Sequence, residues 1–305
     1  MSIKYVHHKD INPQKWNAVI EQSPWPLVYG LYEYLNTVCD QQWDALIFND
    51  YEAVFPLPYK KKFGFKYIVQ PVFCQQLGAF GSSLNVKTLD FLIAIPKRFF
   101  RVRLQLNPYF DGQTNHGQFN HGGIKSIFTR VEITPKTNLT IRLIESLNYN
   151  KDCLKNLSRL STHDIEYRTN HISIHTAIDI YKGAWGEQNP GIGQNEYNKL
   201  ARACSSDHSF TISAHSKNDD RILGAAIFLK TPECSRCCIH YVCAGPTEIG
   251  KSIGVMHGII DFVLKQYQGQ NVLFDFEGSS IASVASFYKK FGASEEPFLY
   301  FKRGF

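Results

Sequence analysis

The order of secondary structure in about the last hundred residues limits most strongly which folds this chain can adopt. Three apolar segments separated by turn residues predict an antiparallel meander. After the meander we expect a long helix over 249–267 and a strand over 271–276, then a short helix over 281–291 and a last strand over 298–302. This order predicts a mixed α/β (α+β) class, with a mostly antiparallel mixed sheet flanked by helices. The meander segments are residues 210–215, 222–229 and 237–244.

The first half of the chain also alternates between helix and strand signals. Asn12 before Pro13 is typical of a helix start, and a second helix is expected after Pro26. The turn pair Asn49-Asp50 predicts two paired strands around it, followed by a basic loop over 58–66. Further elements are expected as helices over 86–94, 150–160 and 194–204, strands over 43–48, 52–57, 100–106, 126–133 and 138–142, and a long loop over 107–123. We therefore predict two domains, residues 1–142 and 143–305.

Composition fits two folded domains and excludes several other classes. The chain has 305 residues, of which 44% are hydrophobic and 20% charged, which excludes a disordered tail, a collagen and a coiled-coil rod. No apolar run approaches the roughly 20 residues that a membrane span needs. The start MSIKYVHHKD shows no export signal, so we expect a cytoplasmic protein. The net charge of +6 would suit an anionic cofactor, an anionic substrate or nucleic acid.

Eight cysteines are spaced irregularly, which favours reduced thiols. Cys234, Cys237, His240 and Cys243 offer one alternative, a zinc site. The segment 237–243 reads as a strand, however, and simple alternation would place Cys237 and Cys243 on one face and His240 on the other. We therefore expect no metal.

Two short motifs resemble the GNAT acyltransferase superfamily. FYKKFGA at 287–293 is similar to the end of that superfamily's last helix, and FDFEGS at 274–279 resembles its FemAB-like branch, in which two GNAT-like domains are fused. The run at 53–81 resembles the first domain of that branch. The resemblance implies two GNAT-like domains, with the acyl donor bound in the second. Characterised FemAB-like proteins take amino acids from aminoacyl-tRNA.

The resemblance implies that a substrate amine attacks an acyl carbonyl directly. Tyr288 lies where the superfamily commonly places a tyrosine that protonates the departing thiolate, although it could simply pack. Asp275 and Glu277 are two residues apart at a strand end, so they point the same way and a carboxylate there could act as general base. The alternative for Asp275 is a buried acceptor that anchors the next turn. Glu277 is expected to be exposed.

The cofactor site is expected where the meander enters the long helix. The backbone at Cys243 and Ala244 would polarise the acyl carbonyl. Helix N-termini bind phosphates through free N–H groups, and the residues that suit this role are Gly250, Lys251, Ser252 and Gly254. The segment PTEIGKSIGV departs from the superfamily's phosphate-loop pattern, and Glu248 would repel a phosphate. That departure leaves the choice between coenzyme A and aminoacyl-tRNA open.

Two clusters of basic residues could bind phosphates. Lys151, Lys155 and Arg159 recur at helical spacing and should line one helix face, where they would bind a cofactor, a nucleotide-linked precursor or RNA, or only face solvent. Four lysines at 60, 61, 62 and 66 are interleaved with Phe63 and Phe65. Bases could stack on these rings, but we expect the rings to enter the core.

Three functions follow from these observations. The first is N-acyl transfer from acetyl-CoA or another acyl-CoA to a small-molecule or peptide amine held between the two domains. The second is FemAB-type transfer of an amino acid from aminoacyl-tRNA to a peptidoglycan precursor, which would require binding to tRNA. The third is a non-catalytic binding module that keeps the fold.

Overall fold

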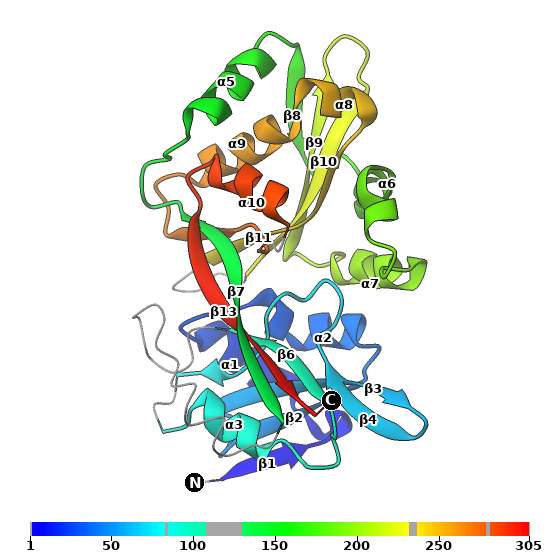
Figure 1. Cartoon of the computed structure of the whole chain (residues 1–305), viewed down its shortest axis with the longest axis vertical. Coiled ribbons are helices and arrows are strands. Elements are labelled where there is room, and N and C mark those ends of the chain that lie inside the picture. The colour runs from blue at the N-terminus through cyan, green and yellow to red at the C-terminus, as the bar shows by residue number, and fades with distance from the viewer. Residues whose placement is uncertain (1, 83–84, 108–129, 232–236, 279–280, 305) are drawn as a thin grey trace. The chain divides into compact units, whose positions relative to one another are not determined.

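The computed structural model describes residues 2–82, 85–107, 130–231, 237–278 and 281–304 (Figure 1). The predicted loop over 107–123 therefore lies almost entirely outside the described residues. The chain forms two compact units. The first holds residues 1–137, 232–236 and 296–305, and the second holds 138–231 and 237–295. The predicted division at 142 and 143 lies close to the point where the chain passes from the first unit to the second.

The sheet of the first unit is a mixed sheet in which β3 is the longest central strand. β3 pairs with β2 over Ala53–Pro58 and then with β4 over Tyr59–Lys62, both antiparallel. β4 runs parallel to β6, and β6 runs antiparallel to β13. The short β5 (Phe80–Gly81) pairs with the start of β3. In spatial order the main strands are β1 (Ile3–Val6), β2 (Trp43–Phe48), β3 (Ala53–Lys62), β4 (Phe65–Val69), β6 (Val102–Leu106) and β13 (Ser294–Arg303).

Two expectations for the first unit are wrong at the same place. The tract 58–66 is not a loop, because β3 continues to Lys62 and turns at Phe63 and Gly64 into β4. Phe63 and Phe65 do not enter the core either, since 88% of Phe63 and 63% of Phe65 remain exposed. The physical reason is their position at the end of the hairpin, because Phe63 lies in the two-residue turn and Phe65 is the first residue of β4, opposite the exposed Lys62.

Helices cover the first unit's sheet. In α1 (Pro13–Gln22), the predicted cap is confirmed, because the Asn12 side chain accepts from the Lys15 amide. Trp16 of α1 is fully buried and packs edge-on against Trp43. The helix expected after Pro26 is split into a short 3₁₀ turn, Val28–Gly30, and α2 (Tyr32–Val38). α3 (Thr88–Ala94) contributes Phe91, which stacks on Phe55 in a second core cluster.

The second unit contains the predicted meander, and its sheet is again mixed. β8, β9, β10 and β11 are consecutive antiparallel neighbours, β12 is parallel to β11, and β7 is antiparallel to β12. β7 is one strand through Pro135, where two strands had been expected. The strands are the second part of β7 (Val131–Arg142), which begins in the first unit, and β8 (Ile165–Thr169), β9 (Ser209–Ser216), β10 (Ile222–Lys230), β11 (Cys237–Pro246) and β12 (Val272–Asp275). These sheets confirm the predicted mixed α/β class.

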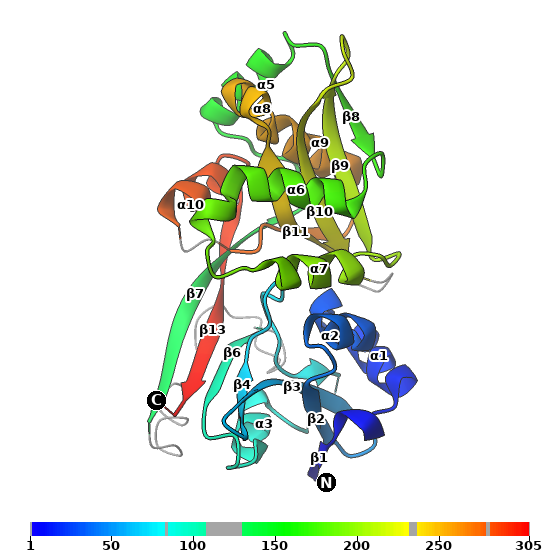
Figure 2. The same cartoon turned by 90° about the vertical axis from the view of Figure 1, so that its right-hand side faces the viewer.

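Helices cover both faces of the second unit's sheet. α6 lies against β9, β10 and β11 on one face, and α9 lies on the other (Figure 2). Residues of α9 join those of the strands in a large apolar cluster, which Phe228, Tyr241 and Phe274 anchor. The sequence prediction missed β8 and α6. The helices are α5 (Lys151–Leu160), α6 (Ile174–Trp185), α7 (Gln194–Ala203), α8 (Glu248–Ile253), α9 (Met256–Tyr267) and α10 (Ala282–Lys289).

The long helix predicted over 249–267 is interrupted at Gly254. This glycine has φ = +76° and ends α8 as a left-handed cap, and its amide donates to the Lys251 carbonyl. The chain then re-enters helix as α9. Glycine adopts this conformation without the penalty that a Cβ atom brings, so a single residue turns one amphipathic stripe into two helices.

Within the residues that the structure describes, no helix has both the length and the apolar character that crossing a membrane requires.

Candidate functional site

The candidate site lies in the second unit where the parallel strands β11 and β12 stop pairing. Their register runs from Cys237 opposite Val272 to His240 opposite Asp275. β11 continues to Pro246, whereas β12 ends at Asp275. The pairing of the two strands therefore ends at His240 and Asp275, and polar side chains gather at this point.

A β-bulge in β11 decides which side chains face this point. Ile227 of β10 lies opposite Cys243 and Phe228 lies opposite Tyr241, so Val242 is the extra residue. Residues opposite each other share a face, and the bulge therefore shifts Cys243 to the face of His240. The expectation that Cys237 and Cys243 share a face is wrong for this reason. Cys234, which was also a ligand in the predicted zinc alternative, lies outside the described residues.

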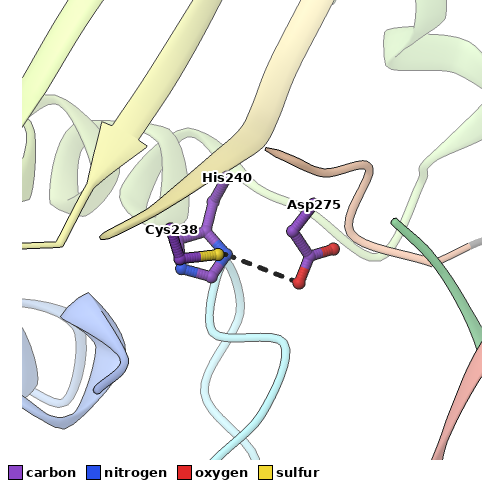
Figure 3. Close-up of side chains that lie close together, drawn as sticks. All are labelled: Cys238, His240 and Asp275. Atoms are coloured by element: carbon purple, nitrogen blue, oxygen red, sulfur yellow. Dashed lines mark hydrogen bonds and ion pairs between the residues drawn. The ribbon is translucent and has the colours of Figure 1, made fainter. Parts of the chain in front are cut away.

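Two carboxylates converge on His240, which is completely buried. His240 Nδ1 lies 2.8 Å from Glu277 Oε1 and 3.7 Å from Asp275 Oδ2 (Figure 3 shows Asp275 facing the histidine ring). Asp275 Oδ2 also accepts a 3.0 Å hydrogen bond from Asn138 Nδ2 on β7. The structure thus brings Asp275 and Glu277 together, as predicted. They meet at His240, for which the sequence had suggested only a role as a zinc ligand.

The backbone after β12 places Glu277. Asp275 Oδ1 accepts a 2.7 Å hydrogen bond from the Glu277 amide, so the predicted role of Asp275 as the anchor of the following turn is present. Glu277 has φ = +64° and Gly278 has φ = +71°, two successive left-handed residues that turn the chain back toward β11. The Glu277 side chain is 16% exposed, so the expectation of an exposed residue is wrong. Its carboxylate lies over the buried histidine.

Burial changes the acid–base properties of this group. Burial and the nearby charge of Glu277 raise the pKa of Asp275 to about 7. Burial lowers the pKa of His240, so that the neutral imidazole is favoured near pH 7. A neutral imidazole that donates Nδ1–H to Glu277 would leave Nε2 as the acceptor. The site therefore holds one carboxyl group, that of Asp275, whose pKa is raised to about 7, beside a histidine that is mainly neutral at that pH.

The same residues include a set of donor atoms that suits a metal ion. Ligand atoms of Cys238, His240 and Asp275 all lie within 4.8 Å of one another, and all three residues are buried. Cys238 Sγ lies 3.9 Å from His240 Nδ1, which Figure 3 shows side by side. Thiolate, imidazole and carboxylate are ligands that Zn²⁺ accepts, with bonds of about 2.0–2.3 Å. The arrangement could hold a divalent cation after small side-chain shifts.

Tyr288 lies on α10 beside this group. Its ring stacks on Phe276 at 4.4 Å between centroids and meets Tyr241 edge-on at 6.1 Å. Burial, followed by the nearby Tyr181 and the charge of Glu277, raises the pKa of Tyr288 above its usual value. The hydroxyl therefore keeps its proton near pH 7. Both the packing role and the acid role weighed for Tyr288 are compatible with this position.

The residues predicted to bind a cofactor phosphate make contacts within the protein itself. Thr247 caps α8, accepting from the Gly250 amide through Oγ1 and from the Lys251 amide through its carbonyl. Gly250 packs so closely on β10 that an added Cβ would lie 1.7 Å from the Leu223 carbonyl oxygen. Ser252 donates to the Ile249 carbonyl. These contacts give residues 247–252 a structural role. Glu248 lies in the first turn of α8.

The backbone next to Cys243 also takes part in a hydrogen bond within the protein. The Ala244 carbonyl accepts a 3.0 Å hydrogen bond from the Trp185 indole. Cys243 is buried, and burial raises the pKa of its thiol. Its thiolate is therefore disfavoured, which makes Cys243 a poor nucleophile.

The predicted basic row on α5 is formed and exposed. Lys151, Lys155 and Arg159 are all exposed, whereas Cys153 and Leu160 of the same helix are buried. Arg159 Nη2 donates to the Ile253 carbonyl at 3.3 Å and so helps to cap α8. The two lysines stay available for a phosphate, and the arginine is partly used in structure.

No protein-family model matches the sequence, and no curated protein matches it. Solved structures do share its fold. FemX aligns with a TM-score of 0.68 and 11% identity over 98% of this chain and 97% of FemX. L-PGS from Bacillus licheniformis aligns with a TM-score of 0.59 and 11% identity over 96% of this chain and 92% of that one.

A GCN5-related glucosamine N-acetyltransferase region of a fungal multi-domain GH3 β-N-acetylglucosaminidase also aligns. Its TM-score is 0.51 at 12% identity, over 99% of this chain and 38% of that one. The predicted resemblance is thus confirmed at the level of the fold: this chain has the FemAB-like fold of two GNAT-like domains.

Proposed function

We propose that the second unit transfers an acyl or aminoacyl group from an activated donor to an amine. The observation that carries this proposal is the meeting of Glu277 and Asp275 over His240 where β11 and β12 stop pairing. Acyl transfer to an amine needs a base for the ammonium proton and an acid for the leaving group. This point of the sheet offers both kinds of group within one fold unit.

Glu277 is the proposed general base, because it is the member of the group that remains partly exposed. The hydrogen bond from His240 fixes its carboxylate, and Asp275 fixes its backbone. The amine loses a proton to Glu277 and attacks the acyl carbonyl. Tyr288 is the proposed acid: its hydroxyl gives a proton to the leaving oxygen or sulfur as the bond to the acyl carbon breaks.

Two donors are compatible with this chemistry, and one observation favours the aminoacyl donor. The Gly250 and Lys251 amides, which would bind the coenzyme A pyrophosphate, already donate to Thr247. Glu248 places a negative charge in the same helix turn. An acyl-CoA donor would have to bind its phosphates elsewhere, for example at Lys151 and Lys155. An aminoacyl-tRNA needs no pyrophosphate site.

The direct test is product detection by mass spectrometry with each donor in turn. The full chain is incubated with a panel of primary amines and either acetyl-CoA or a pool of aminoacyl-tRNA. An acylated or aminoacylated amine that depends on the protein supports the proposal and identifies the donor. A folded protein that produces neither product would contradict it and favour the non-catalytic alternative.

A further inference from the structure

The hairpin tip at residues 60–66, where β3 turns into β4, exposes aromatic rings that a folded protein would be expected to bury. Phe63 and Gly64 form the turn with φ values of +50° and +80°. Phe63 is 88% exposed and Phe65 is 63% exposed. Phe65 meets Phe100, itself 52% exposed, edge-on at 5.9 Å between ring centroids. Figure 1 shows the hairpin of β3 and β4 extending from its sheet.

Lysines surround these rings. The register pairs Lys62 with Phe65 and Lys60 with Tyr67, so these residues share one face of the hairpin. Lys60, Lys61 and Lys62 are all exposed. Lys66 is already neutralised, since its Nζ lies 3.0 Å from Asp44 Oδ2. No aspartate or glutamate occurs in the sequence between Glu52 and Asp90, so three lysines at the tip keep their positive charge unopposed by acidic neighbours in sequence.

We propose that the hairpin tip docks this protein on an anionic lipid surface, with Phe63 and Phe65 inserted at the headgroup boundary and Lys60, Lys61 and Lys62 at headgroup depth. Phenylalanine beside lysine is the composition of interfacial anchors, since the ring enters the apolar boundary and the ammonium group contacts anionic headgroups. Exposed aromatic rings rimmed by charge mark such surfaces in soluble folds.

The shape of the tip favours a lipid surface over single-stranded RNA. RNA without sequence preference binds in charged grooves, where bases stack on rings along a surface. Phe63 projects from the end of a two-residue turn, which is a convex feature. The tip offers lysine rather than arginine, the residue preferred for nucleic-acid recognition. Insertion into a bilayer surface needs only the convex tip and its charge. This inference is independent of the proposed transfer reaction.

Vesicle sedimentation with the full chain tests the proposal. We expect binding to vesicles that contain phosphatidylglycerol, little binding to pure phosphatidylcholine vesicles, and release of the protein by added salt. The double variant Phe63→Ser/Phe65→Ser should weaken binding at least about tenfold. The triple variant Lys60→Gln/Lys61→Gln/Lys62→Gln should weaken it by on the order of a hundredfold, at about fivefold for each lysine.

Matched controls separate the tip from general charge and exposed apolar surface. Leu154→Ser removes another exposed apolar side chain that lies beside lysines, on α5, and should leave vesicle binding unchanged. Lys217→Gln/Lys265→Gln/Lys289→Gln removes three exposed charges elsewhere and should weaken binding far less than the triple variant at the tip. Circular dichroism confirms that each variant is folded.

Three results would overturn the proposal. One is the absence of binding to anionic vesicles at low salt. Another is binding that the Phe63→Ser/Phe65→Ser variant retains in full. The third is binding to bulk tRNA, measured by fluorescence anisotropy, that the same variants abolish while vesicles are not bound. That last result would assign the tip to RNA instead.

Discussion

His240 Nδ1 and Glu277 Oε1 lie 2.8 Å apart, although the two residues are separated by 37 positions in the sequence. The contact joins His240, the last residue of β11 that pairs with β12, to the turn that follows β12. It fixes the partly exposed carboxylate of Glu277 beside the buried ring of His240. Asp275 fixes the same turn, because its side chain accepts a hydrogen bond from the Glu277 amide. The acid–base chemistry proposed for this protein depends on that contact.

Asp275 makes the stability of the fold depend on pH. Its pKa is about 7 in the folded protein against an ordinary value of 3.8, so between these values the folded state binds the proton more strongly. The free energy of unfolding therefore has a contribution from Asp275 that is full below about pH 4 and is lost as the pH rises to about 7. That loss amounts to at most about 1.4 kcal/mol per pH unit.

Asp275→Asn removes this contribution. The variant should be less stable than the wild type at pH 5, because Asp275 accepts one buried and one partly buried hydrogen bond, and the difference should shrink at pH 7.5. Urea unfolding at both pH values measures it. Asp152→Asn, whose side chain is 70% exposed, is the control and should follow the wild type. A constant difference between Asp275→Asn and wild type would refute the proposed titration.

Tyr288→Phe should separate packing from proton donation. The phenyl ring keeps its stacking on Phe276, so the melting temperature should change little. Loss of the hydroxyl should lower kcat by about a hundredfold or more, with a small effect on KM. Tyr267→Phe removes a hydroxyl from a ring that packs near Phe210 and should leave kcat unchanged. Equal kcat in the Tyr288→Phe variant and the wild type would leave Tyr288 with packing alone.

Two glycines in helices should respond to alanine in opposite ways. Gly183 lies in α6 with nothing within 4 Å of an added Cβ, so Gly183→Ala should stabilise the protein by about 0.4–1 kcal/mol. Gly250→Ala would place its Cβ 1.7 Å from the Leu223 carbonyl oxygen, so it should destabilise by about 2 kcal/mol or more. Urea unfolding of both variants measures the contrast. A stable Gly250→Ala variant would mean that α8 can move away from β10.

Local signals in the sequence predicted much of the fold. The Asn12 cap, the turn at Asn49-Asp50 and the order of elements after Phe210 each depend on neighbouring residues, and the structure contains all three. α6 was missed although Ser173 caps it, because Gly183 weakens its helical pattern. The prediction of a single helix over 249–267 was wrong for a related reason. The apolar periodicity continues through Gly254, which adopts φ = +76° and ends the first of two helices.

The candidate site was predicted only in part, because its geometry is not local. Spacing alone placed Asp275 and Glu277 together, but nothing in the sequence brings them to His240. Simple alternation along β11 also failed, since one inserted residue, Val242, moves every later side chain to the other face. His240 was a local signal, because it is a buried polar residue on a mostly apolar strand. Its role depends on the neighbouring strand β12, which the sequence does not identify.

The most direct test of the account is a double-mutant cycle between His240 and Glu277. Single-turnover rates of transfer are measured for the wild type, His240→Asn, Glu277→Gln and the double variant, with the donor that the product assay identifies. Glu295→Gln, an exposed carboxylate paired with Lys289, is the control and should keep the wild-type rate. Thermal unfolding of every variant shows whether it is folded.

If the two residues act as one unit, each single change lowers the rate by about a hundredfold or more, and the double variant is no slower than the slower single variant. Rates that multiply in the double variant would show that the residues act independently. A Glu277→Gln variant that transfers as fast as the wild type would contradict the central claim that this carboxylate is the base.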